Sequence, residues 1–94
     1  MAAIGLLELE VHLPHARSRK DKRRVIRSIK DRARARHNIA IAEVGEVERI
    51  RFCHLAVVTV SGARLDAEKR LASVAEIVEQ TAEIEVTERR MQWL

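Results

Sequence analysis

The spacing of apolar residues changes from one segment of this chain to the next, and this change constrains the fold most. Residues 4–13 alternate apolar and charged side chains, which is the two-residue period of a strand with one buried face. Pro14 ends this segment. The following segment, up to about Arg36, repeats its apolar residues every three to four positions, the period of an amphipathic helix.

The second half of the chain repeats this alternation of periods. Residues 39–44 are short and β-branched and predict a strand, and residues 45–49 form a polar connection of hairpin length. Residues 50–60 are a nearly continuous apolar run, typical of a central strand covered on both faces. A second helix is predicted at about 65–80, and a last strand is predicted around Ile84 and Val86.

The predicted order is therefore βαββαβ. Two split βαβ units with right-handed crossovers give an α+β fold of the ferredoxin-like kind. It has a four-stranded antiparallel sheet with two helices on one face. The length of 94 residues predicts a single domain spanning residues 1–94.

The first helix carries recognisable boundary signals. Ser18 is predicted as its N-cap, with Asp21 three residues later in a weaker version of the capping box. Asn38 suits a left-handed position just after the C-terminus. The apolar residues at helical spacing predict the buried stripe, which consists of Val25, Ile26, Ile29 and Ala33.

The same helix holds most of the positive charge. Of the 18 Lys and Arg residues, eleven lie between Arg17 and Arg36, opposed only by Asp21 and Asp31. The net charge of the whole chain is only +4, so the rest of the chain is acidic. So concentrated a positive field attracts a polyanion, and counterion release from phosphates favours such binding without base-specific contacts.

The outward side of the helix is predicted to bind RNA. At about 100° per residue, one row of four basic residues lies opposite the apolar stripe and is about 16 Å long. The row consists of Arg23, Arg27, Lys30 and Arg34. Almost no acid is interleaved to form helical ion pairs, which argues against an ordinary solvated face. With only Phe52 and Trp93 as aromatics, the chain lacks a base-stacking sheet, so contacts to the backbone of a structured RNA are expected. The predicted RNA-binding residues are Arg19, Lys20, Arg23, Arg24, Arg27, Lys30 and Arg34.

Three stretches together resemble the YlxP-like family of small bacterial proteins. They are L-L-E-L-E-V-H-L-P at 6–14, S-R-K-D-K-R at 18–23 and A-E-V-G at 42–45, and the resemblance covers nearly the whole chain. It implies a ferredoxin-like fold and a gene setting among transcription, translation-initiation and ribosome-maturation factors, with no agreed activity. Arg19 stands where the family usually has an apolar residue, and Ile50-Arg51 stands where it commonly has Trp-Gln.

Lys22 differs from the other cations of the helix. It projects towards the buried stripe, near the start of the helix. We interpret it as a structural lysine that either snorkels past the sheet edge or pairs with an acid such as Glu8 or Glu10.

The remaining reactive side chains do not indicate catalysis or a metal site. His12 and His15 are separated by Pro14 and have no evident third ligand. Cys53 and His54 are neighbours on a strand, so they point to opposite faces and cannot form a nucleophile–base pair. We expect no enzymatic activity, no cofactor and no metal, and Cys53 is interpreted as a core residue.

The sheet face without helices predicts a homo-oligomer, most simply a two-fold dimer through this face or through a joined strand edge. It mixes apolar and charged side chains, which is typical of a subunit contact. The side chains expected there are Ile4, Leu6, Phe52, Ala56 and Val58, mixed with Glu8, Glu10 and His54. Near the C-terminus, Met91 and Trp93 are expected to cover a sheet edge or to meet a partner.

These features predict a small non-enzymatic RNA-binding accessory protein. The resemblance adds the ribosome or its precursors as the site of action. The alternative is a homo-oligomeric interaction module whose basic helix docks on an acidic protein partner. A single cysteine fits the reducing cytoplasm, and no apolar run is long enough to span a membrane.

Overall fold

Six elements follow one another in the order that the apolar spacing predicts. The computed structural model describes residues 1–94. Its elements are β1 (Ala3–His12), α1 (Arg19–Arg36), β2 (Ala40–Val44), β3 (Phe52–Ser61), α2 (Arg64–Glu79) and β4 (Glu85–Trp93). Neither helix is both long enough and apolar enough to cross a membrane.

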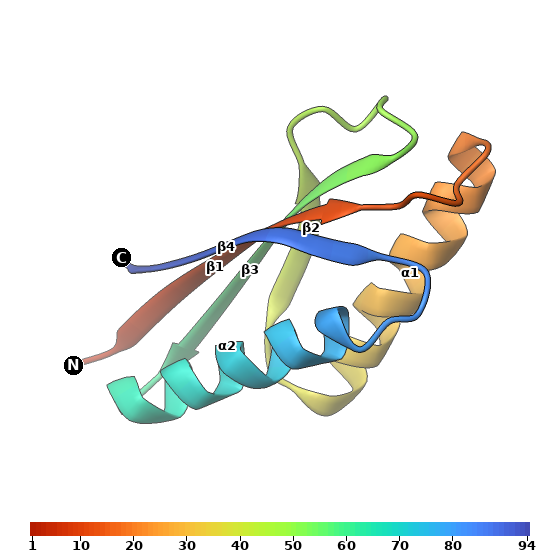
Figure 1. Cartoon of the computed structure of the whole chain (residues 1–94). Coiled ribbons are helices and arrows are strands. Elements are labelled where there is room, and N and C mark those ends of the chain that lie inside the picture. Colours follow the sequence, from red (N-terminus) through yellow and green to blue (C-terminus); the bar gives the residue numbers. More distant parts are fainter.

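The four strands form one antiparallel sheet in the order β2-β3-β1-β4. Strands β1 and β3 are paired along their whole length, from Ala3 opposite Ser61 to His12 opposite Phe52. Both helices lie against the same side of the sheet (Figure 1). This confirms the ferredoxin-like arrangement.

The hydrophobic core lies between the sheet and the two helices. Alternate residues of the central strands enter it, among them Leu7, Leu9 and Leu55, and α1 contributes the predicted stripe of Val25, Ile26, Ile29 and Ala33. The largest side chains that the core encloses completely are Leu7, Leu9, Leu13, Ile29, Leu55, Leu71, Val11, Val57, Val74, Val78 and Cys53.

The opposite side of the sheet is covered by no helix (Figure 1), and we call it the open face. Since β3 has one face on the core and the other on this side, the prediction that residues 50–60 are covered on both faces is wrong. The open face is formed by Ile4, Leu6, Glu8, Glu10 and His12 of β1, Ala40, Ala42 and Val44 of β2, Phe52, His54, Ala56, Val58 and Val60 of β3, and Glu85, Glu88, Arg90 and Gln92 of β4.

The conformation just after α1 and the extent of β4 differ from the prediction. α1 ends at Arg36, and the following His37 is extended with φ of −138°, so Asn38 does not adopt the expected left-handed conformation. β4 continues to Trp93 because β1 pairs with it almost to its start, with Gly5 opposite Trp93.

Trp93 covers the end of the sheet. A Cβ atom on Gly5 would lie 3.2 Å from its ring, so the glycine allows this close approach. The guanidinium of Arg64 lies over the ring at 4.5 Å from its centre. The ring of Trp93 therefore packs against Gly5 and Arg64 of its own chain.

Candidate nucleic-acid interface

The helix α1 is anchored at its start by its predicted cap. The Asp21 backbone N–H donates to the Ser18 hydroxyl at 3.1 Å. The Asp21 carboxylate accepts a hydrogen bond from the Arg17 backbone N–H at 2.9 Å, one residue before the position of a standard capping box. Since the cap and the apolar stripe fix the rotation of the helix, they decide which basic residues face the solvent.

The predicted RNA-binding residues all lie on the outward side of α1. Lys30 is half-buried, and the other six, Arg19, Lys20, Arg23, Arg24, Arg27 and Arg34, are exposed. Two polar hollows run beside the row that contains Arg23 and Arg27. The first is lined by Lys20, Asp21, Arg23, Arg24, Arg27, Ser28, Asp31 and Arg32. The second is lined by Arg23, Ile26, Arg27, Lys30, Asp31, Arg34 and Glu43.

Most of these cations have no carboxylate partner. Only Lys22 and Arg24, of the eleven basic residues between Arg17 and Arg36, form an ion pair, which leaves nine without one. The Arg24 guanidinium donates to both carboxylate oxygens of Glu83, at 3.0 and 3.5 Å, and this hydrogen bond raises the pKa of Arg24. Arg34 donates to the Ile41 carbonyl oxygen at 3.4 Å. The cations without a carboxylate partner therefore extend along the whole helix, from Arg19 to Arg36.

The structure adds Arg32 to the predicted set. It lines the first hollow beside Arg24, and its guanidinium donates to the Thr81 hydroxyl at 2.8 Å. Arg32 follows Arg24 by eight residues, just over two helical turns, and this spacing could have indicated that the two lie near each other on the helix. The sequence prediction included the row around Arg27 and the flanking Arg19, Lys20 and Arg24, but it left out Arg32.

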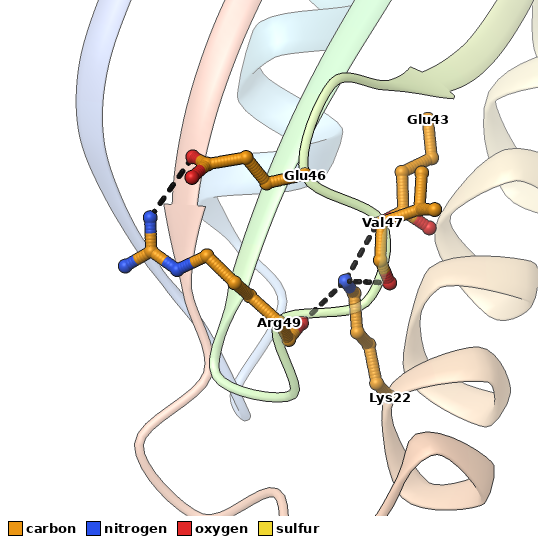
Figure 2. A network of polar contacts seen from close by, with 5 residues as sticks. All are labelled: Lys22, Glu43, Glu46, Val47 and Arg49. Carbon is orange, nitrogen blue, oxygen red and sulfur yellow. Dashed lines mark hydrogen bonds and ion pairs between the residues drawn. The ribbon is translucent and has the colours of Figure 1, made fainter.

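Lys22 is buried and has a structural role (Figure 2). Its ammonium group lies 2.6 Å from a Glu43 carboxylate oxygen and donates to the carbonyl oxygens of Val47 and Arg49 at 3.0 and 2.6 Å. The ammonium group thus makes one ion pair and donates two hydrogen bonds. These contacts tie the β2–β3 connection to the start of α1.

The predicted pairing of Lys22 with Glu8 or Glu10 is wrong. Those two carboxylates lie on the open face, whereas Lys22 and Glu43 are on the helix side of the sheet. The connection also needs Gly45, whose φ of +73° lies in the left-handed region that favours glycine. The residues of the S-R-K-D-K-R and A-E-V-G stretches therefore include a helix cap, a buried ion pair and a turn.

Cys53 lies in the core and His54 lies on the open face, as predicted for neighbours on a strand. Burial, followed by the charge of Glu43, raises the pKa of the Cys53 thiol to about 12. A thiol with this pKa remains protonated at neutral pH and is a poor nucleophile.

The open face carries charge of the opposite sign. The His54 imidazole lies 3.2 Å from a Glu8 carboxylate oxygen, and His12 lies 3.9 Å from Glu85. A hydrogen bond with Glu88 raises the pKa of Glu10. The carboxylates are thus separated from the cations of α1 by the full thickness of the sheet. His15 lies in the connection before α1, and nowhere do three His, Cys, Asp or Glu side chains converge as metal ligands.

Solved structures share the fold at low sequence identity. A de novo designed protein, Foldit4, superposes with a TM-score of 0.57 at 14% identity, over 98% of this chain and 97% of its own. A C-terminal segment of the alpha subunit of aIF2 from Pyrococcus abyssi gives 0.52 at 13% identity, over 99% of this chain and 49% of that one. These likenesses concern the fold alone.

Sequence similarity shows the family as well as the fold. The chain is 32% identical to the uncharacterized protein YlxP of Bacillus subtilis (strain 168) over 90 residues, which is 96% of this chain and 98% of that protein. Residues 4–91 match the family described as "Protein of unknown function (DUF503)". The predicted resemblance to YlxP is confirmed, and the chain belongs to the DUF503 family.

Proposed function

We propose that this protein is a non-enzymatic RNA-binding accessory protein of the cytoplasm, which uses the outer side of α1 to contact the backbone of a structured RNA. The observation that carries the proposal is the set of nine basic residues between Arg17 and Arg36 that have no carboxylate partner. Unpaired arginines suit phosphates because the planar guanidinium forms two parallel hydrogen bonds with phosphate oxygens.

The distribution of charge over the two sides of the sheet supports an oriented encounter. Four carboxylates of the open face, Glu8, Glu10, Glu85 and Glu88, lie on the side of the sheet away from α1. Phosphates attract one side and repel the other, so the protein approaches RNA with α1 first.

The absence of aromatic rings from α1 favours contacts to the backbone over contacts to bases. Phe52 lies on the open face under the Arg49 guanidinium, and Trp93 lies under Arg64. Recognition of single-stranded RNA depends on stacking bases on such rings. A duplex or otherwise structured RNA, of which ribosomal RNA is the main cellular example, fits this surface better.

Salt dependence tests the proposal. If α1 neutralises about four to six phosphates, a plot of log K against log salt has a slope of roughly −3 to −5. Replacing Arg23, Arg27, Lys30 and Arg34 by Gln is expected to flatten the slope and weaken binding to a structured RNA. Filter binding or fluorescence anisotropy measures both quantities.

A second quadruple variant controls for net charge. Arg64, Lys69, Arg89 and Arg90 are all exposed and lie outside α1, so changing these four to Gln removes the same charge. This control is expected to keep most of the affinity and the slope. Equal losses in the two variants would reduce the effect to overall charge, and no loss in the α1 variant would exclude α1 as the binding surface.

The ribosome is the particular RNA that we propose. Co-sedimentation with ribosomal subunits in low salt, and its loss in high salt, is the expected result. The other proposed partner of α1 is an acidic protein, for which the same unpaired cations are suitable. An acidic protein that displaces labelled RNA only at large excess supports RNA, whereas retention of the acidic protein in the presence of excess RNA supports the alternative.

A further inference from the structure

The open face has two halves whose side chains differ in length. On β2 and the adjoining part of β3 most side chains are short, among them Ala40, Ala42 and Ala56, and His54 is the one long side chain there. On β1 and β4 they are long, and they include Glu8, Arg90 and Gln92. The register places Ala42, Ala56, Glu8 and Arg90 in one row across the sheet, from short to long.

One end of this face is apolar. Ile4 pairs with Val60 and Leu6 pairs with Val58, so four aliphatic side chains lie together at the end where β1 begins. Ile4 is 38% exposed and Val60 is 52% exposed. A cluster of adjoining exposed aliphatic side chains is typical of a contact surface, whereas single exposed ones are ordinary.

We propose that the open face binds a second copy of this chain, through a two-fold axis that lies between β1 and β3 and runs along the strands. This rotation exchanges the two halves of the face. The short β2–β3 half of each copy then receives the long β1–β4 side chains of the other. The proposal concerns a surface that RNA binding by α1 does not use, so it stands independently of the proposed function.

The difference in side-chain length between the two halves of the face favours this axis. A two-fold axis across the strands would keep β1 over β1 and β4 over β4, so long side chains would meet long ones and alanines would face a void. Cores pack well when large and small residues face each other. Packed sheets also keep their strands within about 30° of one another, which the axis along the strands allows.

The same axis keeps like charges from directly facing each other. In the row that contains Val44, His54, Glu10 and Glu88, the rotation brings His54 of each copy opposite Glu10 of the other. No carboxylate of this row meets the same carboxylate of the second copy. The hydrogen bond with Glu88 raises the pKa of Glu10, so this carboxyl takes up a proton more readily than an ordinary one when the face is covered. Arg90 lies opposite Ala42 of the second copy.

The size of the face predicts a weak dimer. With strands about 4.8 Å apart and a rise of about 3.3 Å per residue, four strands of this length present about 500–600 Å². Specific interfaces begin at about 600 Å² per partner. Dimerisation is therefore expected in the micromolar to submillimolar range.

Charge substitution on the short half tests the interface. Ala42 is exposed on the edge strand β2, so Ala42→Arg places a long cation against Arg90 of the second copy without entering the core. We expect sedimentation equilibrium from low micromolar to several hundred micromolar to show at least tenfold weaker dimerisation than wild type. Ala72→Arg is the matched control, because Ala72 is exposed on α2 and far from the open face. It is expected to dimerise like wild type.

A charge swap tests the axis. Adding Arg90→Glu to Ala42→Arg places an acid opposite the new arginine and is expected to restore most of the lost affinity. Failure of this rescue would overturn the proposed axis. Wild-type protein that stays monomeric over the whole range, or Ala42→Arg that dimerises like wild type, would overturn the interface.

Circular dichroism of each variant shows whether it is folded. If Ala42→Arg does not fold, Val60→Asp replaces it, because Val60 is more than half exposed and the axis places it opposite Ile4 of the second copy. RNA affinity of the monomeric variant at concentrations below the dimerisation range is expected to equal that of wild type. This measurement separates failure of the dimer from failure of RNA binding.

Discussion

The buried lysine of α1 is the residue on which the β2–β3 connection depends. Lys22 is only 3% exposed, and its ammonium group holds Glu43 and two backbone carbonyl oxygens. Replacing it by Met keeps the length of the side chain but leaves a carboxylate without its partner. Breaking one side of a buried ion pair typically costs about 3–5 kcal/mol.

We therefore expect Lys22→Met to lower the free energy of unfolding in urea by about 3–5 kcal/mol. Lys20→Met, an exposed lysine of the same helix, is the control and is expected to change it by less than about 0.5 kcal/mol. Replacing Glu43 by Gln as well is expected to regain part of the loss, because no charge then remains unpaired. A Lys22→Met protein as stable as Lys20→Met would mean that the ion pair contributes nothing to the fold.

Because of Cys53, the stability of the folded protein is expected to depend on pH in the alkaline range. Its pKa in the folded protein is about 12, above the ordinary value of 9.0 in the unfolded chain. The folded state therefore holds the proton more tightly. The stability that this gives is fully present below pH 9.0 and is lost as the pH rises towards 12.

Urea unfolding at increasing pH is expected to show this loss in the wild type. Cys53→Ala is less stable at neutral pH because of the cavity it leaves, but it is expected to decline less between pH 9.0 and 12. Parallel declines in the two proteins would show that the thiol is not the group responsible.

Residues whose signals are local were predictable, and residues whose partners depend on the sheet were not. Ser18 and Asp21 lie three positions apart, so the cap follows from the sequence itself. The alternation of β1 already places Glu8 on the face without helices, so it could have been excluded as a partner of Lys22. The choice of Glu43 was not predictable, because it depends on how the β2–β3 connection folds over the start of α1. The left-handed conformation predicted for Asn38 is also wrong. The preference of asparagine for this conformation is weak, and the extended His37 already ends the helix.

At the scale of elements, the unpaired cations of α1 carry a cost as well as a binding role. Side chains three and four positions apart on a helix are neighbours, and like charges there destabilise the helix by about 0.2–0.5 kcal/mol per pair. Arg23, Arg27, Lys30 and Arg34 form three such neighbouring pairs. The surface proposed to bind RNA is therefore also a source of instability.

This repulsion predicts how stability responds to salt. Replacing Arg23, Arg27, Lys30 and Arg34 by Gln is expected to raise the free energy of unfolding at low salt by about 1 kcal/mol. In about 1 M salt, where the Debye length is near 3 Å, the gain is expected to shrink towards zero because the wild-type charges are screened. Urea unfolding at two salt concentrations measures both. A variant less stable than wild type at low salt would show that these cations do not repel one another appreciably.

The elements themselves were predictable to different degrees. α1 and α2 follow from helical periodicity, and the apolar residues that α1 buries are the predicted ones. The length of β4 was not predictable, because residues 87–92 show no apolar alternation. Its backbone pairing with β1 holds this segment in the sheet, and an irregularity between Glu10 and Val11 shifts the register there.

At the scale of the whole molecule, the order of elements was sufficient to predict the sheet. Right-handed crossovers and the antiparallel hairpin between β2 and β3 leave few topologies for βαββαβ, and the order β2-β3-β1-β4 is the one they favour. The separation of charge between the two sides of the sheet could be predicted only in part from the sequence. The cations are contiguous in the sequence, whereas the carboxylates of the open face come from β1 and β4, at opposite ends of the chain.

The placement of both helices on one side of the sheet has a consequence for stoichiometry. If two copies join through their open faces, each α1 lies on an outer layer, and the two basic surfaces point in opposite directions. Such a dimer does not grip a single RNA segment with both helices. It bridges two segments, so at intermediate protein concentrations it would crosslink distant parts of a long folded RNA. At higher concentrations each segment binds its own dimer, and the crosslinks would be lost.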